Sequence, residues 1–493
     1  MKKRCLVLVT VDCLRADHVG FLGYRRPVTP TLDSLAAQSV VFEDAIVAGA
    51  PTYFSFPGIM ASRHPLSLGR TVLGIAPQES TLATALHDSG YRTGAFVAGN
   101  PYLTARFGYD QGFDEFRDFM TAAAATELMP GAHVPLSKLN RWIDEVSHRN
   151  RVAGASYDEL YFWYCQWRSS RQRVSLDGLR RYPAADVLVD HATDWMRGLG
   201  EEDFFLWIHL MDPHHPYYPP TDAMMAVGAP AVTAQRARFL NSFWNRGDIG
   251  PTRWQKYRDE ILSLYDAGIY WVDKQIGRLI KILQSLGRWD ETVFAVTADH
   301  GEEFLEHGVR YHSPVHLPEE LIRVPLLIRA PGLGAAKIES VFSHIHLAPT
   351  LLDSVGAVVP PTFVGRSRWG EISAGQLSPE TVVVECLDGC NNPFQVKDRI
   401  RPRLLAVRDR EHMLTIRFGE NRETFSSVKE GRENEASASA KKKYAQFVRR
   451  AGEHVKLATR NRRSQTAMRA RIRELRYEGG SGTEMEIGPK TGG

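Results

Sequence analysis

The chain has 493 residues, of which 43% are hydrophobic, and its formal net charge is +4 at pH 7. This length leaves room for two or three domains with sizeable cores. The low net charge argues against a protein that binds nucleic acid through a strong overall field, so no specific nucleic-acid partner is expected. The five cysteines are scattered and form no usual zinc or disulfide pattern, so they are expected to be incidental thiols.

The N-terminal residues do not have the pattern of a signal peptide. Met1-Lys2-Lys3-Arg4 is basic, but a predicted strand that ends at Asp12 follows it, in place of an apolar core and a cleavage site. No stretch approaches the roughly 20 apolar residues of a membrane span. These features predict a soluble, cytoplasmic protein.

Strand and helix patterns alternate from residue 4 to about residue 355. This alternation predicts an α/β fold with a mainly parallel central sheet and helices on both faces. Apolar residues near helical spacing predict a long helix over about 253–286, and another helix is expected to open just after Pro30. The predicted strands span residues 5–11, 39–46, 92–98, 203–210, 292–298 and 323–329.

Changes of composition divide the chain into three predicted parts. Residues 1–375 are expected to form a catalytic domain, in which the helical stretch 121–200 is an insertion that either covers the site as a substrate cap or only packs. Residues 376–440 contain three short apolar runs and predict a small antiparallel α+β subdomain. Residues 441–493 form a basic helical tail that ends in flexible glycines, and it is either solvated or in contact with an acidic surface.

Two distant strands each deliver acidic groups at their carboxyl ends. The strand 5–11 runs into Asp12, and the strand 292–298 runs into Asp299 and His300. Open α/β sheets carry their chemistry at this edge. Carboxylate and imidazole groups are natural ligands of a divalent metal, so these three residues predict a metal site.

Several further motifs occur in the order typical of one enzyme family. They are Asp12–Gly20, Asp212–Tyr217, Asp299–Glu303, Glu306–Gly308, Arg323–Leu326 and Ala348–Asp353. On these motifs most of residues 4–430 resembles the sulfatase family of the alkaline phosphatase superfamily. The resemblance implies an alkaline phosphatase-like fold, and an enzyme in which a metal-bound nucleophile attacks a sulfate or phosphate ester.

The resemblance also implies a set of metal ligands. Asp12, Asp299 and His300 match the metal positions of the family, and the nucleophile at Thr52 is expected to touch the same ion. The oxygen ligands suit one Ca²⁺, Mg²⁺ or Mn²⁺ ion, and the imidazole keeps Zn²⁺ possible. Cys13 stands where the family commonly has a second Asp, so one oxygen ligand is missing.

The nucleophile of sulfatases is a Cys or Ser that is oxidised to formylglycine within a Cys/Ser-x-Pro-x-Arg motif. Alignment from Arg63-His64-Pro65 places Thr52 at the nucleophile, with Phe54 and Phe56 in place of Pro and Arg. Thr52 would then lie at the positive end of a helix, where an anionic substrate is favoured. Ser55 is an alternative nucleophile, and in a third interpretation both residues only cap the helix.

Two histidines and one arginine complete the implied site. His214, which follows the strand 203–210, resembles the histidine that binds the substrate oxygen or leaving group, with His215 as the alternative. His312 lies near the family's Lys or His that protonates the leaving group, and His316 is its alternative. Arg15 is predicted to reach the anion.

A structural role is the other interpretation of Arg15. In that case its guanidinium would form an ion pair with Asp17 or Asp33.

These residues predict a metal-dependent hydrolase of a small or glycan-linked anionic ester. Thr52 would attack, His312 or His214 would protonate the departing alcohol, and phosphoesters would be preferred over sulfate esters. The alternatives are a transferase that passes a phosphoryl-alcohol group to a glycan, a formylglycine-type sulfuric ester hydrolase, and a binding protein that has lost turnover.

Overall fold

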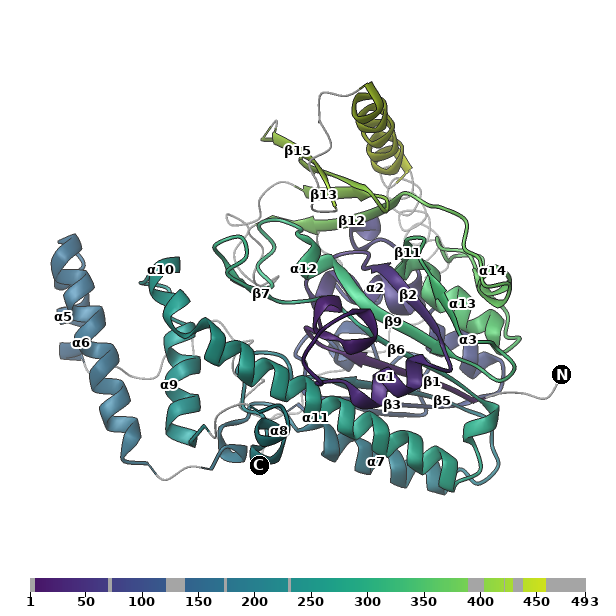
Figure 1. Cartoon of the computed structure of the whole chain (residues 1–493), viewed down its shortest axis with the longest axis horizontal. Coiled ribbons are helices and arrows are strands. Elements are labelled where there is room, and N and C mark those ends of the chain that lie inside the picture. Colours follow the sequence, from purple (N-terminus) through teal and green to yellow (C-terminus); the bar gives the residue numbers. More distant parts are fainter. Residues whose placement is uncertain are drawn as a thin grey trace, which may run out of the picture.

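The computed structural model describes residues 5–69, 73–120, 138–172, 175–228, 232–388, 403–420, 422–428 and 438–457. A nine-stranded sheet in the order β10-β2-β9-β6-β1-β5-β3-β4, with β11 paired to β2, forms the centre of the molecule (Figure 1). Its three middle strands are β1 (Cys5–Val11), β5 (Phe204–Leu210) and β6 (Thr292–Ala298), and every residue in them is buried. Burial on both faces explains their nearly continuous apolar sequences.

The strand directions confirm a mainly parallel sheet, with one exception near one edge. β1 is parallel to β5 and β6, and β3 (Arg92–Val97) is parallel to β5. β9 (Arg323–Arg329) runs antiparallel to both β6 and β2 (Val40–Ile46). The remaining strands of this sheet are β4 (Glu115–Arg117), β10 (Ala336–Ile338) and β11 (Phe342–Ser343).

Helices cover both faces of this sheet. Trp195 of α7 (Ala185–Gly198) packs on Phe204, whereas Phe56 of α2 (Thr52–Ala61) packs on Trp207. Phe204 and Trp207 are three residues apart in β5, so their side chains point to opposite faces. The long helix α11 (Arg258–Ser285) packs on α7, and α3 (Leu82–Asp88) and α13 (Leu347–Ser354) pack with α2.

The long helix predicted over 253–286 is broken near its start. α10 (Pro251–Trp254) precedes a single 3-10 turn, and α11 begins at Arg258. The shorter helices are α1 (Pro30–Ala36), α8 (Thr221–Ala226), α9 (Ala234–Trp244), α12 (Glu319–Ile322) and α14 (Trp369–Ser373). Among the residues in the described ranges, no helix is long and apolar enough to cross a membrane.

The predicted insertion does not form one body over the sheet. α5 (Lys138–Ser147) and α6 (Arg151–Ser170) form a hairpin that projects away from the sheet at the left of Figure 1. α7 lies within the same predicted stretch but belongs to the helical layer of the sheet. Residues 121–137 lie outside the described ranges.

The C-terminal part contains a separate antiparallel sheet, as predicted. Its strands are β12 (Val382–Leu387), β13 (Arg403–Arg408), β14 (His412–Arg417) and the unpredicted β15 (Arg422–Ser427). A short two-stranded sheet, β7 (Glu303–Phe304) with β8 (Arg310–Tyr311), lies near the carboxyl end of β6.

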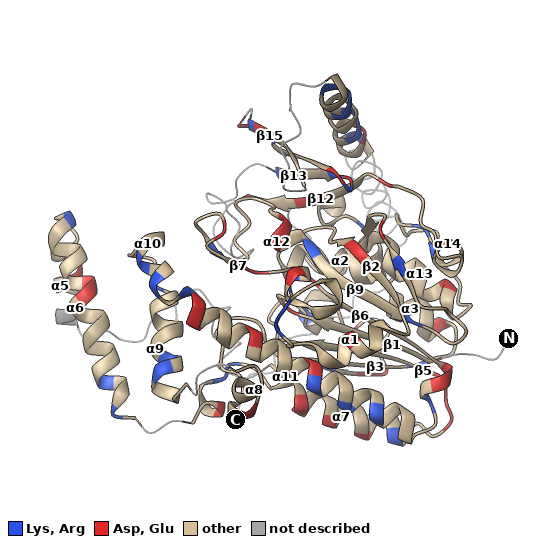
Figure 2. Ribbon diagram, viewed as in Figure 1, with Lys and Arg blue, Asp and Glu red and all other residues tan. Residues whose placement is uncertain are grey.

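The basic segment after residue 440 is not simply a solvated tail. Residues 438–457 are helical, and Phe447 and Ala451 are buried against Val383, Leu405 and their neighbours in the C-terminal sheet. Figure 2 shows that Lys and Arg gather on this helix. The helix is therefore amphipathic, with a basic outer surface, and it packs on the C-terminal sheet. Residues 458–493 lie outside the described ranges.

Candidate active site

Two adjacent strands bring the predicted metal ligands together. β1 and β6 are in register, with Val11 opposite Ala298, so the residues that follow them, Asp12 and Asp299, emerge side by side. One ligand atom from each of Asp12, Asp299 and His300 lies within 4.8 Å of the other two. All three side chains are fully buried. This is the compact geometry that a single cation requires.

The electrostatics of these groups fit a divalent cation. Burial and the nearby charge of Asp12 raise the pKa of Asp299 well above its usual range, and its Oδ2 atom has no hydrogen-bond partner. Burial also lowers the pKa of His300 to about 3, so its ring is neutral. His300 Nδ1 donates to the Gly301 carbonyl at 2.8 Å, which leaves Nε2 as its ligand atom. Two carboxylates and a neutral imidazole suit the cation that sequence analysis predicted.

Thr52 lies beside these groups. It is the first residue of α2, and its Oγ1 atom is 3.1 Å from His300 Nε2. The N-cap is Pro51, and no side chain caps this helix, so the capping interpretation does not describe Thr52. Ser55 is fully buried and donates to the Thr52 carbonyl at 3.2 Å, so its hydroxyl is directed into the helix.

Two of the predicted histidines lie next to this cluster. The His312 ring is 4.7 Å from the His300 ring and 5.1 Å from the His214 ring, between centroids. His214 donates from Nδ1 to the His215 carbonyl. Of their alternatives, His316 pairs through Nε2 with Glu303 at 2.9 Å, whereas the ring of His215 packs on Tyr311 and both of these residues line the cavity beside the cluster.

A buried glutamate lies beside His312. Glu302 Oε1 lies 3.4 Å from His312 Nδ1, and the Glu302 side chain is fully buried. Burial lowers the pKa of His312, but Glu302, with smaller contributions from Asp12 and Glu303, outweighs burial and the net shift is upward. For His214 burial prevails over the charge of Asp12, and its pKa is lowered. The two neighbouring histidines therefore differ in how readily they hold a proton.

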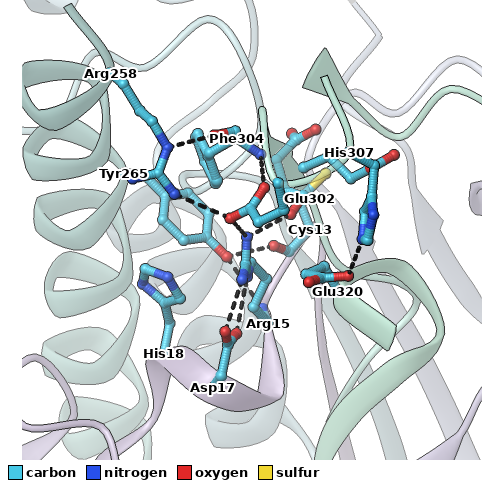
Figure 3. A network of polar contacts seen from close by, with 12 residues as sticks. Cys13, Arg15, Asp17, His18, Arg258, Tyr265, Glu302, Phe304, His307 and Glu320 are labelled. Atoms are coloured by element: carbon cyan, nitrogen blue, oxygen red, sulfur yellow. Dashed lines mark hydrogen bonds and ion pairs between the residues drawn. The ribbon is translucent and has the colours of Figure 1, made fainter. Parts of the chain in front are cut away.

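The structure does not place Arg15 where it could bind the substrate. Its guanidinium donates to Asp17 at 2.8 and 2.6 Å, to Glu306 at 2.8 Å and to the Glu302 carbonyl at 3.0 Å (Figure 3). All three guanidinium nitrogens are occupied, and the residue is 3% exposed. The ion pair with Asp17 describes Arg15, and the predicted contact with the anion is corrected.

Two residues of the site were not predicted. Asn100 donates to Asp12 Oδ2 at 3.0 Å, and His209 Nε2 lies 3.4 Å from the same oxygen. His209 and His214 are among the groups that hold the pKa of Asp12 low despite its burial. Asn100 follows β3, a strand of the same sheet, so the rule that found Asp12 could also have found it. His209 lies within an apolar strand, and nothing in the sequence marks it.

A cavity of about 1000 Å³ opens beside this cluster. Thr52, Asn100, His214 and His312 lie on its wall. Residues 180–182, which belong to the predicted insertion, also line this cavity.

A buried pair of carboxylates, an imidazole and a hydroxyl at this edge of an α/β sheet is an arrangement suited to metal-dependent ester hydrolysis. The model of the Sulfatase family matches residues 4–357, so the chain belongs to the sulfatase family. This finding confirms the predicted family and the predicted ester hydrolase activity, and the family generally uses a divalent metal.

Known proteins similar to the chain include several types of ester hydrolase. The multifunctional alkaline phosphatase superfamily protein PehA of Trinickia caryophylli is 23% identical over 425 residues, which cover 77% of this chain and 79% of that protein. The arylsulfatase of Clostridium perfringens is 25% identical over 390 residues, which cover 73% and 77%. The structure of the phosphonate monoester hydrolase of Silicibacter pomeroyi has a TM-score of 0.63 at 19% identity and covers 93% of this chain and 96% of that one.

Proposed function

We propose that this sulfatase-family hydrolase cleaves anionic esters, with phosphoesters preferred over sulfate esters, through a covalent intermediate on Thr52. The observation that carries the proposal is the position of the Thr52 hydroxyl. It lies at the first residue of α2 and 3.1 Å from His300 Nε2. A helix N-terminus favours the anionic group that the hydroxyl would attack. The substrate is a small or glycan-linked ester.

The surroundings of Thr52 favour phosphate over sulfate. A threonine cannot become formylglycine, and Phe56, in place of the arginine of the modification motif, packs on Trp207 and His209 with ring centroids 5.5 and 5.1 Å apart. A sulfate ester of threonine lacks the second hydroxyl with which formylglycine expels sulfate. A phosphate ester of threonine can instead be hydrolysed by water, so phosphoester cleavage fits this residue better.

Asp12, Asp299 and His300 would hold the cation, with Thr52 in contact with it. When bound, the cation would lower the pKa of the Thr52 hydroxyl and offset negative charge on the transferred group. The Cys13 thiol, 3.1 Å from Asp12 Oδ1, adds no anionic oxygen, and burial holds its pKa well above the usual range. The remaining ligands are compatible with Mg²⁺, Mn²⁺, Ca²⁺ or Zn²⁺.

The residues of the chain would carry the reaction in two steps. First, the Thr52 hydroxyl releases its proton to solvent and a bond forms between Oγ1 and phosphorus, while the bond to the alcohol oxygen breaks and His312 gives its proton to that oxygen. Second, a water molecule attacks phosphorus, His312 takes one proton of this water, and Thr52 Oγ1 leaves and recovers its proton from solvent. His214, 5.1 Å from His312 between ring centroids, would bind a substrate oxygen.

The experiment compares two variants on two substrates with metal added back. Thr52→Ala should reduce turnover of an aryl phosphodiester by roughly 10³-fold or more, since it removes the nucleophile. Ser55→Ala loses only a hydrogen bond within the helix and should cost about 1 kcal/mol of stability. Mass spectrometry of protein trapped with substrate should find the adduct on Thr52.

Other results would reject parts of the proposal. A dead Ser55→Ala enzyme beside an active Thr52→Ala enzyme would place the nucleophile three residues later. Faster turnover of an aryl sulfate than of the phosphodiester would reject the phosphoester preference, whichever residue carries the adduct.

A further inference from the structure

The cavity beside Thr52 is much larger than the group that the proposed reaction transfers. Its volume of about 1000 Å³ reaches the upper end of the range for pockets that enclose whole ligands. A phosphate or sulfate group at the cation centre occupies only a small part of this volume. The rest is available for the organic part of the ester, so the residues along this wall bear on substrate choice.

Arg310 lies on this wall without an anionic partner. Its Nε and Nη1 atoms are buried and have no hydrogen-bond partner. Its Cζ atom lies 3.6 Å from the centre of the Trp254 ring, which also lines the cavity. Within the part of the chain that the structure describes, no carboxylate pairs with it. Buried donors in this state are rare and costly, which calls for a partner that the described residues do not supply.

Arg180 lies on the same wall and is only partly satisfied. Its Nε and Nη2 atoms are buried without a hydrogen-bond partner, and Nη1 reaches Asp212 at a long 3.5 Å. Asp177, the other nearby carboxylate, is 3.7 Å away and its side chain is 83% exposed. Burial outweighs Arg180 and raises the pKa of Asp212 to about 7, so Asp212 carries less than a full negative charge near neutral pH.

Residues next to the two arginines contact histidines on the same wall of the cavity. Tyr182, two residues after Arg180, has its ring 6.1 Å from His214. The His215 ring is 4.8 Å from Tyr311, the neighbour of Arg310. The wall therefore passes from Arg180 through the histidines to Arg310, so both arginines line the space that is left for the organic part of the ester.

We propose that Arg180 and Arg310 bind a second oxyanion, and that the preferred substrate is an ester whose organic part carries a further phosphate, sulfate or carboxylate. A guanidinium presents several fixed donors and matches the paired oxygens of such groups. The inference rests on the proposed function for the position of the reacting ester. The requirement for a second anion is independent of which residue attacks.

The test uses phosphodiesters that share one leaving group and differ only in the second charge. Ethyl 4-nitrophenyl phosphate is compared with its 2-carboxyethyl, 2-sulfoethyl and 2-phosphonoethyl counterparts by kcat/KM. The full-length enzyme should prefer at least one doubly anionic ester by about tenfold or more, as expected for charge-assisted hydrogen bonds. The counterpart that is preferred identifies the anion.

The variants connect that preference to the two arginines. Arg310→Ala and Arg180→Ala should each reduce the preference to about twofold or less, and Arg310→Lys should retain part of it, because charge remains but the fork of donors is lost. Arg278→Ala is the control, since Arg278 pairs with Asp190 on the surface and should keep the full preference. Circular dichroism identifies variants that fail to fold.

Two results would overturn the inference: no preference in the unmodified enzyme, or a preference that survives both alanine substitutions in folded protein.

If the diesters are not cleaved, the proposed function fails separately. Inhibition of 4-nitrophenyl sulfate turnover then compares ethane-1,2-disulfonate with ethanesulfonate. The ratio of the two inhibition constants, measured in the unmodified enzyme and in the same variants, decides whether the oxyanion site exists. If no ester is turned over, calorimetric binding of these two sulfonates gives the same comparison.

Discussion

The role that we propose for Thr52 depends on the position of its side chain. A hydroxyl on an exposed helix would be unremarkable, but Thr52 is 5% exposed and shares its surroundings with His300. Ser55, one helical turn away, has the same functional group and is turned into the helix. The difference between these two residues is geometric, so it could not be read from the sequence alone.

The pair of His312 and Glu302 predicts a specific pH dependence. His312 must be protonated to act as an acid, and Glu302 raises its pKa. Glu302→Gln removes that charge, so the pKa should fall and the alkaline limb of the kcat profile should move to lower pH by roughly one unit. Glu320→Gln, which affects a carboxylate paired with the more distant His307, is the control. An alkaline limb that stays in place would show that Glu302 does not act through His312.

The correction for Arg15 also gives a prediction. Arg15→Ala should lower the free energy of unfolding by about 2 kcal/mol, because it removes the ion pairs with Asp17 and Glu306 and leaves the largely buried Glu306 with Arg258 as its remaining partner. Adding Glu306→Gln should recover part of this loss. Urea unfolding of the two variants measures both effects. A rise in KM in Arg15→Ala without a loss of stability would restore the substrate-binding interpretation.

At the scale of elements, the strands were the best predicted part of the molecule. The predicted strand over 292–298 coincides with β6, and that over 203–210 begins one residue before β5. Buried strands are nearly unbroken apolar runs, which mark their own boundaries. The direction of β9 could not be predicted, because such a run looks the same in either direction.

Features that depend on distant partners were beyond the sequence. Arg15 and Glu306 are 291 residues apart, and only the folded chain shows that they pair. The basic composition of residues 441–457 concealed the apolar face that carries Phe447. A basic composition predicts that a helix is exposed, but it cannot show that one face of the helix packs on a sheet.

The helix at residues 438–457 should contribute to stability. Phe447→Ala should cost about 3 kcal/mol, since the side chain is fully buried against the C-terminal sheet. Its neighbour Val448 is 40% exposed, and Val448→Ala should cost less than about 0.5 kcal/mol. Chemical denaturation of both variants provides the comparison. Equal effects of the two substitutions would mean that the helix does not contribute through this packing.

Truncation extends the same comparison to the whole segment. Ending the chain after residue 440 removes Phe447, Ala451 and His454, which pairs with Glu385 at 2.6 Å, and it should lower the melting temperature. Ending it after residue 457 keeps these contacts and should leave turnover of a small ester unchanged. Loss of turnover in the longer form would show that residues 458–493 take part in the chemistry.

At the scale of the whole molecule, we expect a cation bound at the proposed site to stabilise the folded protein. Asp12 and Asp299 are buried together, and their repulsion opposes folding until a cation offsets it. Mn²⁺, Zn²⁺, Ca²⁺ or Mg²⁺ added to chelator-treated protein should therefore raise the melting temperature. At a cation concentration 100 times the dissociation constant, the free energy of unfolding should increase by about 2.7 kcal/mol.

A variant separates this effect from general binding of ions. Asp299→Asn should stabilise the metal-free protein, because it removes the repulsion, and should abolish the gain from added cation. Differential scanning calorimetry measures both quantities. A variant that still responds to the cation like the original protein would place the ion elsewhere.

The central position of β1 determines when the sheet can be completed during synthesis. Its two neighbours, β5 and β6, begin about 200 and 290 residues later in the chain. At ribosomal rates of about 5–20 residues per second, β1 waits on the order of tens of seconds for its second partner. During this interval an apolar strand has at least one edge unpaired and is prone to aggregation. The strand that provides Asp12 thus precedes the other strands of this sheet in the chain but is enclosed only after β6 is made, so the yield of active enzyme should depend on the chaperones that meet the nascent chain.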